Sequence, residues 1–367
     1  MKMSVGVDLH KGQFTVYWLS DDRSIEECER YWTDVEGYEK FEGRLKEYVE
    51  AGSEVEVAVE STGNTRYFKR RVELVGVVVK VINTQKFKVV NESVKKTDRH
   101  DSRTIAEFLQ KDMLPESQLC SEESEQLRRL LKSRTLLVRT VVALKNQVHG
   151  LLLSNGIDTR RGQLQSKKER RRILDVLAEQ GLAGQAVEPL FETIDRVENE
   201  VKKLEKLLIQ RVEGDRVVEL LMSIPGTGVI TAATVRAYVD DISRFRGYKQ
   251  FSAYAGLVPW VQNSNARERY GSITKRGPEP LRTALVQMVL GMVRNQRLTG
   301  AYHLMLRYQV MKAHKGSGKT IIATARKLSK IVWYMLRNDE PFSPIRMTDP
   351  DIRRIIFEMR AAVTEAA

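Results

Sequence analysis

The sequence predicts a fold of the class α/β plus all-α, in which one mixed-sheet domain precedes helical domains. Segments that alternate like strands end at Ile82, whereas after Pro115 the apolar residues recur at helical spacing. The early order of strand, strand, strand, helix, strand and helix indicates a mixed sheet with helices packed on it. We expect an α/β domain, a long helical middle with a coiled-coil seam, a helical C-terminal domain and a peripheral tail, at residues 1–114, 115–216, 217–340 and 341–367.

The composition is that of a soluble globular protein with an excess of positive charge. The chain has 367 residues, of which 42% are hydrophobic and 30% charged, enough for two or three domains. Its 61 basic and 48 acidic residues give a net charge of +13, which favours nucleic acid as a partner, although a merely basic protein has the same composition. Cys28 and Cys120 lack metal-ligand spacing and indicate reduced thiols in the cytoplasm. No signal peptide or membrane-spanning apolar run is visible, so we expect no membrane association.

In the N-terminal domain, short runs of strand-forming residues are separated by turn and capping signals. Gly12 supplies a turn between the first two runs, which therefore predict a hairpin. The predicted elements are strands 4–8, 14–19, 54–60 and 77–82, a helix capped by Ser61 or Thr62 that ends near Leu74, and a helix from Thr97 to Lys111.

Four acidic residues stand at the ends of these elements. Asp8 and Glu60 end strands with apolar cores, where a carboxylate is costly unless it is paired or bound to metal. Asp98 and Asp101 stand three residues apart at the start of a helix, so both project from one face. Any one of them could instead be a cap or a first-turn charge that complements the helix dipole. As a set, they predict a site for Mg²⁺ or Mn²⁺, since such ions take hard oxygen ligands and keep positions open for phosphate oxygens and water.

The five histidines show no metal-ligand spacing. His10 and His100 lie close in sequence to the predicted ligands, so one of them could assist at the site. A histidine in an ordinary surface or core position is the commoner case.

The middle of the chain predicts two long helices, from Ser124 to Leu153 and from about Glu188 to Arg211. Apolar residues of the second helix are spaced 4-3-4-3-4, which is typical of a short coiled-coil seam that folds on the first helix or against another subunit. Between the two helices lies a basic segment with only Glu169 to oppose it. Its cations are expected to contact nucleic-acid phosphates: Arg160, Arg161, Lys167, Lys168, Arg170, Arg171 and Arg172.

The C-terminal domain begins with a predicted helix-hairpin-helix. Pro225, Gly226 and Gly228 make the tight turn, and the helix that starts near Val229 would present backbone N–H groups to a phosphate, so both glycines are candidate nucleic-acid contacts. Residues 255–277 are expected to be irregular. Further helices are predicted at 281–295, 302–312 and 320–336.

The segment from Ala313 to Thr320 fits a relaxed phosphate-loop pattern with alanine in place of the first glycine. A true phosphate loop follows a buried strand, whereas the preceding residues predict a helix. ATP binding is therefore the less favoured interpretation. We expect a turn and a helix start, with Lys315 and Lys319 available to a nucleic-acid backbone.

Ser264 lies in a polar segment between two glycine-marked turns. A serine near several cations could attack a phosphodiester, because the cations stabilise the developing negative charge. An ordinary hydrogen-bonding serine is the commoner case. The nearby cations, which are also candidate nucleic-acid contacts, are Arg267, Arg269, Lys275 and Arg276.

These residues resemble the DEDD-type transposases of the insertion-sequence-110 class, a family that includes the Piv DNA invertases. The resemblance covers roughly residues 4–336, with the blocks in the family's order. The matching blocks are Gly6-Val-Asp-Leu-His-Lys11, Glu60-Ser-Thr-Gly63, Lys96-Thr-Asp-Arg-His-Asp-Ser-Arg103, Ile224-Pro-Gly-Thr-Gly228, Ala255-Gly-Leu-Val-Pro259 and Gly271-Ser-Ile-Thr-Lys-Arg-Gly277 with Leu281-Arg282.

The resemblance implies a RuvC-like, ribonuclease-H-type N-terminal domain whose four acids are Asp8, Glu60, Asp98 and Asp101. It also implies a nucleophilic serine five residues after Pro259, which is Ser264; the family usually has glycine where this chain has Asn265. Members of the family use a structured bridge RNA to select DNA.

On this basis we expect an insertion-sequence transposase that recombines DNA through a covalent phosphoserine link, as a homodimer or homotetramer. Two alternatives remain open at this stage. A metal-dependent nuclease or junction resolvase would use the four acids with water, and a non-catalytic nucleic-acid-binding protein would need neither the acids nor the serine.

Overall fold

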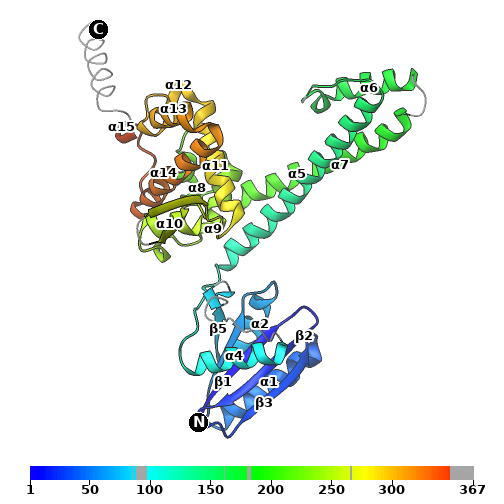
Figure 1. Ribbon diagram of the computed structural model, residues 1–367. Coiled ribbons are helices and arrows are strands. Elements are labelled where there is room, and N and C mark those ends of the chain that lie inside the picture. Colours follow the sequence, from blue (N-terminus) through cyan, green and yellow to red (C-terminus); the bar gives the residue numbers. More distant parts are fainter. Residues whose placement is uncertain (85, 88–96, 161, 180–182, 265–266, 348–367) are drawn as a thin grey trace. The chain divides into compact units, whose positions relative to one another are not determined.

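A computed structural model describes the chain apart from residues 85, 88–96, 161, 180–182, 265–266 and 348–367, which Figure 1 draws as a thin grey trace. The chain divides into two compact units, Met1–Leu119 and Cys120–Ala367.

The first unit is built on a five-stranded mixed sheet with the strand order β3-β2-β1-β4-β5. The first three strands are antiparallel neighbours, whereas β1, β4 and β5 run parallel. The strands are β1 (Lys2–Leu9), β2 (Gln13–Ser20), β3 (Glu26–Trp32), β4 (Glu54–Glu60) and β5 (Val78–Ile82), and the helices are α1 (Val35–Glu50), α2 (Thr65–Glu73) and α4 (Asp98–Gln110).

The two faces of this sheet bury different helices. Val5 and Val7 of β1 share a core with Phe41 of α1 and Phe68 of α2. On the other face, Ala58 of β4 packs with residues of α4. The alternation of side chains along each strand therefore decides which residues meet α4, and this is the helix that carries two of the predicted acids.

Two predictions for this unit need correction. The strand β3 and the helix α1 are missing from the predicted elements. The sequence of β3 is highly charged, as is usual for an exposed edge strand, and its polar and apolar residues do not alternate. The helix α2 is capped by neither Ser61 nor Thr62. It begins at Thr65, after Asn64, whose side chain makes no capping hydrogen bond, and the Thr62 hydroxyl donates to Asn64 Oδ1 at 2.8 Å.

The second unit begins with two long antiparallel helices, α5 (Glu122–Ser154) and α7 (Ala183–Arg211), with α6 (Lys167–Glu179) between them in the chain (Figure 1). Their antiparallel register is marked by ion pairs between Arg134 and Glu205 and between Lys145 and Glu198. The predicted helices therefore fold on each other.

Two apolar cores stabilise this helical pair. Val148 and Leu152 of α5 pack with Ile194 of α7 in one core. Nearer the other end, Leu131 of α5 and Leu208 of α7 belong to the core of the helices that follow. The segments predicted as a middle and a C-terminal domain thus share one compact unit.

α5 is the one helix, in the part of the chain that the structure describes, with the length and apolar composition to cross a membrane. A single helix of this kind is weak evidence for a membrane protein.

The remaining elements of the second unit are further helices, of which α14 is the longest, and one β-hairpin. The predicted turn before Val229 is present, with Gly226 at φ +80° and Gly228 as the N-cap of α9. The elements are α8 (Arg216–Met222), α9 (Val229–Val239), α10 (Tyr248–Tyr254), β6 (Pro259–Ser264), β7 (Arg267–Ile273), α11 (Glu279–Arg294), α12 (Gln296–Thr299), α13 (His303–Lys315), α14 (Ser317–Asn338) and α15 (Pro344–Met347).

Two further expectations were wrong. Residues 255–277 are not irregular, because β6 and β7 form an antiparallel hairpin within them. The tail is not wholly peripheral, since Phe342 is buried against Tyr302 and its N–H donates to Ser223 Oγ at 2.8 Å.

Adjacent leucines of α7 give a matched test of the packing between α7 and the core. Leu208 is fully buried, whereas Leu207 is 50% exposed. We expect Leu208→Asp to lower the free energy of unfolding by at least about 3 kcal/mol, because it buries an unpaired carboxylate. Leu207→Asp should change it by less than about 1 kcal/mol. Thermal and urea denaturation of both variants measures this, and equal effects would contradict the observed packing.

Candidate functional site

Asp8 lies one residue before the end of β1 and points to the face of the sheet that α4 covers. The strand alternation fixes this direction, since Val5 and Val7 enter the opposite core. Gly6 allows α4 to approach: a Cβ atom at this position would lie 2.1 Å from the carbonyl oxygen of Ser102 and 2.5 Å from the nitrogen of Ala106. The close approach of α4 leaves Asp8 only 9% exposed.

Glu60 lies at the same level of the neighbouring strand. The parallel register of β1 and β4 pairs Val7 with Val59, so Asp8 and Glu60 are the next residue of each strand. Parallel strands carry the side chains of a matched pair on the same face, which places both acids at the carboxyl edge of the sheet. The backbone carbonyl of Glu60 accepts a hydrogen bond from Thr65 Oγ1 at 2.7 Å, which ties this edge to the start of α2.

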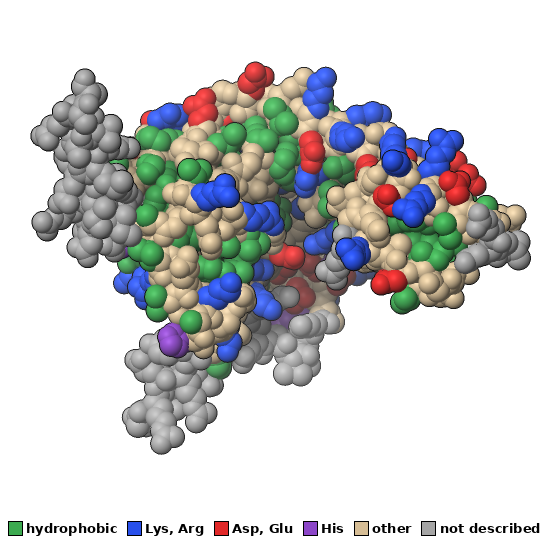
Figure 2. All heavy atoms as spheres, turned by 90° about the horizontal axis from the view of Figure 1, so that it is seen from above, with side chains coloured by type: hydrophobic (Ala, Val, Ile, Leu, Met, Phe, Trp, Pro, Cys, Tyr) green, Lys and Arg blue, Asp and Glu red, His purple; other side chains and the backbone are tan. Residues whose placement is uncertain are grey.

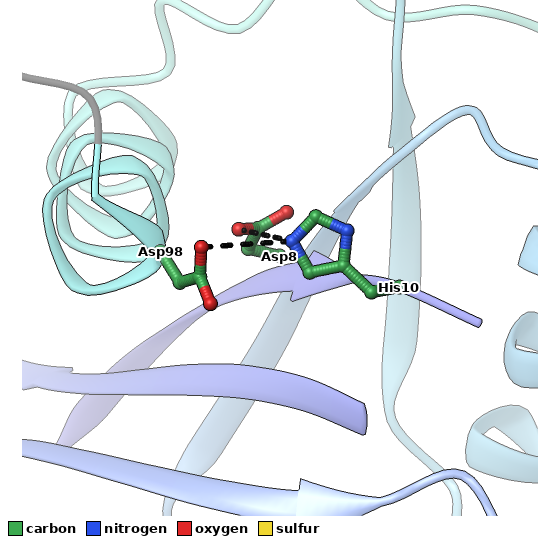
Figure 3. A group of neighbouring side chains, drawn as sticks. All are labelled: Asp8, His10 and Asp98. Atoms are coloured by element: carbon green, nitrogen blue, oxygen red, sulfur yellow. Dashed lines mark hydrogen bonds and ion pairs between the residues drawn. The ribbon is translucent and has the colours of Figure 1, made fainter. Parts of the chain in front are cut away.

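The N-terminus of α4 brings the other two acids to this edge. The predicted helix begins one residue later than expected, because Thr97 is its N-cap: the Thr97 side chain accepts a hydrogen bond from the His100 N–H, and both Asp98 and Asp101 lie in the first turn. The imidazole of His10 points one ring nitrogen toward the carboxylates of both Asp8 and Asp98 (Figure 3). His10 Nε2 lies 3.1 Å from Asp8 Oδ2 and 3.7 Å from Asp98 Oδ1.

The interaction of Asp8 with His10 does not offset the burial of Asp8 and the negative charges of its acidic neighbours. Burial raises its pKa above the ordinary value, His10 opposes this rise, and the negative charges of Asp98 and Asp101 add to it. The charge of Asp101 is therefore felt at Asp8. A cation placed among these acids would relieve both the desolvation and the repulsion.

This donor set fits a hard divalent cation. Asp8, His10 and Asp98 each offer one ligand atom, and these atoms lie within 4.8 Å of one another in the described part of the chain. Carboxylate oxygens are the ligands that Mg²⁺ and Mn²⁺ prefer. His10 belongs to this group and His100 does not. In the sequence, the one signal that distinguishes His10 as a candidate ligand is its position two residues after Asp8.

Ser264 lies in the second unit, at the end of β6. Its backbone pairs with that of Arg267 in β7, so it borders the tip of the hairpin. Asn265 is outside the described residues. Lys275 and Arg276 follow β7 and are exposed, and the guanidinium of Arg282 donates to the carbonyl oxygen of Lys275 at 3.2 Å.

The basic segment after α5 is only partly available to a ligand. Arg160, Lys167, Lys168, Arg171 and Arg172 are exposed. Arg161 lies outside the described residues.

The prediction that Arg170 contacts nucleic acid is wrong. Its side chain is 4% exposed and is engaged by Asp195 and Glu198 of α7 and by the carbonyl oxygen of Leu164. Arg170 instead fixes α6 onto α7, since removing it would leave the two carboxylates without their buried partner.

Gly226 also has a structural reason to be glycine. A Cβ atom there would lie 2.5 Å from the backbone of Gly291, so the turn before α9 packs directly on α11. At Gly228 a Cβ atom would meet nothing within 4 Å.

Comparison with known proteins links both units to DNA transposition. Residues 5–155 match a family described as Transposase, the DEDD transposase domain of IS110 elements, and residues 218–304 match the Transposase IS116/IS110/IS902 family. A DEDD transposase domain implies a RuvC-like fold, with which the five-stranded mixed sheet of the first unit agrees.

Curated relatives cover most of the chain. A probable family 20 transposase of Pseudomonas aeruginosa is 29% identical over 78% of this chain and 86% of its own length. The transposase for insertion sequence element IS1111A of Coxiella burnetii is 28% identical over 78% of this chain and 79% of its own length. The pilin gene-inverting protein of Moraxella lacunata is 31% identical over 34% of this chain and 38% of its own length. The chain belongs to the IS110 family of transposases, enzymes that cut and rejoin DNA.

Proposed function

We propose that this transposase cuts DNA by metal-assisted attack of Ser264 on a phosphodiester and rejoins it from the resulting phosphoserine. The observation that carries the metal part is the convergence of Asp8 and Asp98, with the charge of Asp101, at one edge of the sheet.

The four acids, Asp8, Glu60, Asp98 and Asp101, are the residues that would hold Mg²⁺ or Mn²⁺. When bound, such an ion supplies positive charge to the phosphate under attack and lowers the pKa of a coordinated hydroxyl. His10 keeps Asp8 oriented toward Asp98 through its 3.1 Å contact. α4 fixes the spacing of the acids, because Ser102 and Ala106 pack directly on Gly6.

The reaction proposed for Ser264 needs no reactant other than DNA. Its hydroxyl gives up a proton as Oγ forms a bond to phosphorus, the bond from phosphorus to a DNA oxygen breaks, and that oxygen takes up a proton. In the second step the hydroxyl of another DNA end attacks the phosphoserine, which joins the DNA and returns the serine hydroxyl. A serine hydroxyl is weakly nucleophilic at neutral pH, so it needs the acidic site for activation.

The positive charge of the surface favours a nucleic-acid partner, and exposed apolar side chains favour association with further subunits. Lys and Arg side chains are spread over the face drawn in Figure 2. We propose that the exposed cations after α5 bind a structured bridge RNA. We also propose that the protein is a homodimer or homotetramer, since three large apolar side chains of α5 are exposed: Leu136 by 65%, Val142 by 53% and Leu153 by 68%. We propose that it acts in the cytoplasm.

The proposed function is tested by trapping a covalent complex. Wild-type protein with Mg²⁺, its flanking non-coding RNA and a labelled plasmid that carries the element should yield DNA that stays attached to protein after denaturation. Magnesium-dependent cleavage without an adduct would instead support a nuclease that uses water, and the absence of both would leave only nucleic-acid binding.

Gly6 offers a prediction about the spacing of the acids. Gly6→Ala should displace α4 by about 1 Å and reduce cleavage by about 100-fold, since misplacement on this scale has such costs in active sites. Gly43 in α1 is the matched control, because a Cβ atom there would meet nothing within 4 Å. Gly43→Ala should raise stability by about 0.5–1 kcal/mol and leave cleavage unchanged. Equal cleavage by the two variants would contradict the role given to α4.

A further inference from the structure

A large basic groove lies in the second unit beside the hairpin that carries Ser264. Its volume is about 1360 Å³, above the usual range for a small-molecule pocket. Its walls come from α10, α13, α14, the start of β6 and the end of β7. The cations that line it are Lys249, Arg307, Lys315, Lys319, Arg326, Lys327 and Lys330.

Among the residues that the structure describes, no carboxylate compensates the positive charge of this groove. The sequences of α10, α13 and α14 contain no aspartate or glutamate, and none lines the groove. Within the described residues, none of the seven lining cations forms an ion pair, whereas Arg44, Arg71 and Arg236 elsewhere each engage carboxylates. Exposed cations held together without counter-charges create a strong attractive potential for a polyanion.

The segment that resembles a phosphate loop lines part of this groove. Gly316 is the N-cap of α14 with φ +74° and no side-chain cap, so the first N–H groups of a 22-residue helix remain available to an anion. A Cβ atom at Gly318 would meet nothing within 4 Å, so a ligand can approach the backbone there. Lys319 stands in this same turn.

The same geometry disfavours a nucleoside triphosphate. The segment follows the helix α13 rather than a strand. The Thr320 hydroxyl, which would face a metal ion in a phosphate loop, donates to the carbonyl oxygen of Gly316 at 2.7 Å and is 1% exposed. The groove is also lined by cations from three helices, α10, α13 and α14, as suits an extended chain of phosphates.

The groove is connected to Ser264 by a single strand. Pro259 lines the groove and is the first residue of β6, and Ser264 is the last. Five residues of strand span about 17 Å. A DNA strand carries a phosphate about every 3.4 Å of helix axis, so this span corresponds to about five nucleotides.

We propose that this groove binds the phosphodiester backbone of the DNA strand that flanks the cleaved phosphate, about five nucleotides from it. The inference rests on the role proposed for Ser264 and adds the surface that positions its substrate. Lys319 and Lys327 are positioning residues, because they hold the strand and do not touch the reacting atoms.

The test is the salt dependence of DNA binding, measured by fluorescence anisotropy with a labelled 20-base-pair duplex. The full-length protein carries Asp98→Asn in every sample, so no strand is cut during the titration. Each phosphate contact contributes about 0.9 to the slope of log affinity against log salt. We expect Lys319→Gln with Lys327→Gln to reduce this slope by about 2 and to weaken binding by about tenfold or more at physiological salt.

The matched control removes the same charge from other surfaces. Lys46 of α1 and Lys206 of α7 are exposed and line no part of the groove. Lys46→Gln with Lys206→Gln should leave the slope within about 0.5 of the parent value. Equal slopes for the two double variants would overturn the proposal, as would displacement of the duplex by ATP but not by the same concentration of inorganic phosphate.

A second measurement separates this inference from the proposed function. In chains with intact acids, the groove variant should need about tenfold more DNA for half-maximal adduct formation, with its rate at saturating DNA unchanged within about threefold. A reduced rate at saturation with an unchanged DNA requirement would overturn the positioning role. An absence of adduct in the wild-type protein would instead refute the phosphoserine mechanism, and the salt slopes would still report on the groove.

Discussion

Asp8→Asn is expected to abolish magnesium-dependent DNA cleavage and, in the same protein, to raise the melting temperature of the metal-free form. The first effect should reach about 1000-fold or more, because the variant would remove one of the proposed anionic metal ligands. A residue that serves only the fold would show the opposite pattern, since its loss would lower the melting temperature first.

The sign of the stability effect follows from the pKa of Asp8. Burial raises this pKa above its ordinary value, so the folded protein favours the protonated carboxyl. The stability that the protonated form contributes is fully present below the unfolded pKa and is lost as pH rises through the folded pKa. At neutral pH the ionised Asp8 therefore costs stability in the metal-free protein, and the uncharged amide avoids this cost.

Asp22 provides the control with the opposite sign. Hydrogen bonds from the hydroxyls of Ser20 and Ser24 lower its pKa to about 2. The stability that its ionised form contributes is present above the unfolded pKa and is lost as pH falls through the folded value. Asp22→Asn should therefore lower the melting temperature at pH 7 and leave cleavage intact.

Thermal melts in chelator at pH 7, followed by a magnesium titration, measure both effects. Wild-type protein should gain stability with added Mg²⁺, since a ligand that binds only the folded state stabilises it by mass action. Asp8→Asn should gain much less. A lower melting temperature for Asp8→Asn in chelator, or an undiminished response to Mg²⁺, would contradict the assignment of Asp8.

Local pattern predicted the elements that surround the site. The alternation of residues 54–60 matches β4 residue for residue, and the helix predicted over 97–111 matches α4 to within one residue at each end. Such elements can be predicted from short stretches of sequence, because the alternation of a strand and the cap of a helix depend on residues that are neighbours in the chain.

The parts that were missed depend on contacts distant in sequence. β3 is an exposed edge strand whose charged residues do not alternate with apolar ones, and β6 and β7 form a hairpin by pairing with each other. Arg170 is one of seven cations in its segment, and only the fold of α6 on α7 distinguishes it as buried. Likewise, the groove at the base of the β6–β7 hairpin combines cations from α10, α13 and α14, which no single window of the sequence contains.

Ser264→Ala is expected to eliminate the covalent protein–DNA adduct while the protein still folds and binds DNA. Loss of the hydroxyl removes the atom that would bond to phosphorus, so no residual adduct should remain. Ser133 on α5 is exposed and serves as the control, and Ser133→Ala should form the adduct at the wild-type rate. If Ser264→Ala recombines DNA and forms the adduct normally, the nucleophile is another residue, and the asparagine that follows Ser264 in place of the family's glycine would be the reason.

Mixing two inactive chains tests whether the serine and the acids of one active site come from different subunits. Ser264 belongs to the second unit and the four acids to the first, so the proposed reaction would require the two units to meet on DNA, either within one chain or between chains. Ser264→Ala chains and Asp101→Asn chains should each be inactive alone. If subunits share sites, a mixed oligomer contains some sites with both an intact serine and intact acids, and adduct formation should return to about a quarter of the wild-type level for random dimers. The adduct should then form only on the Asp101→Asn chain, which mass-tagging of the two chains would reveal. If each site is built within one chain, the mixture stays inactive at every ratio, because no chain carries both parts.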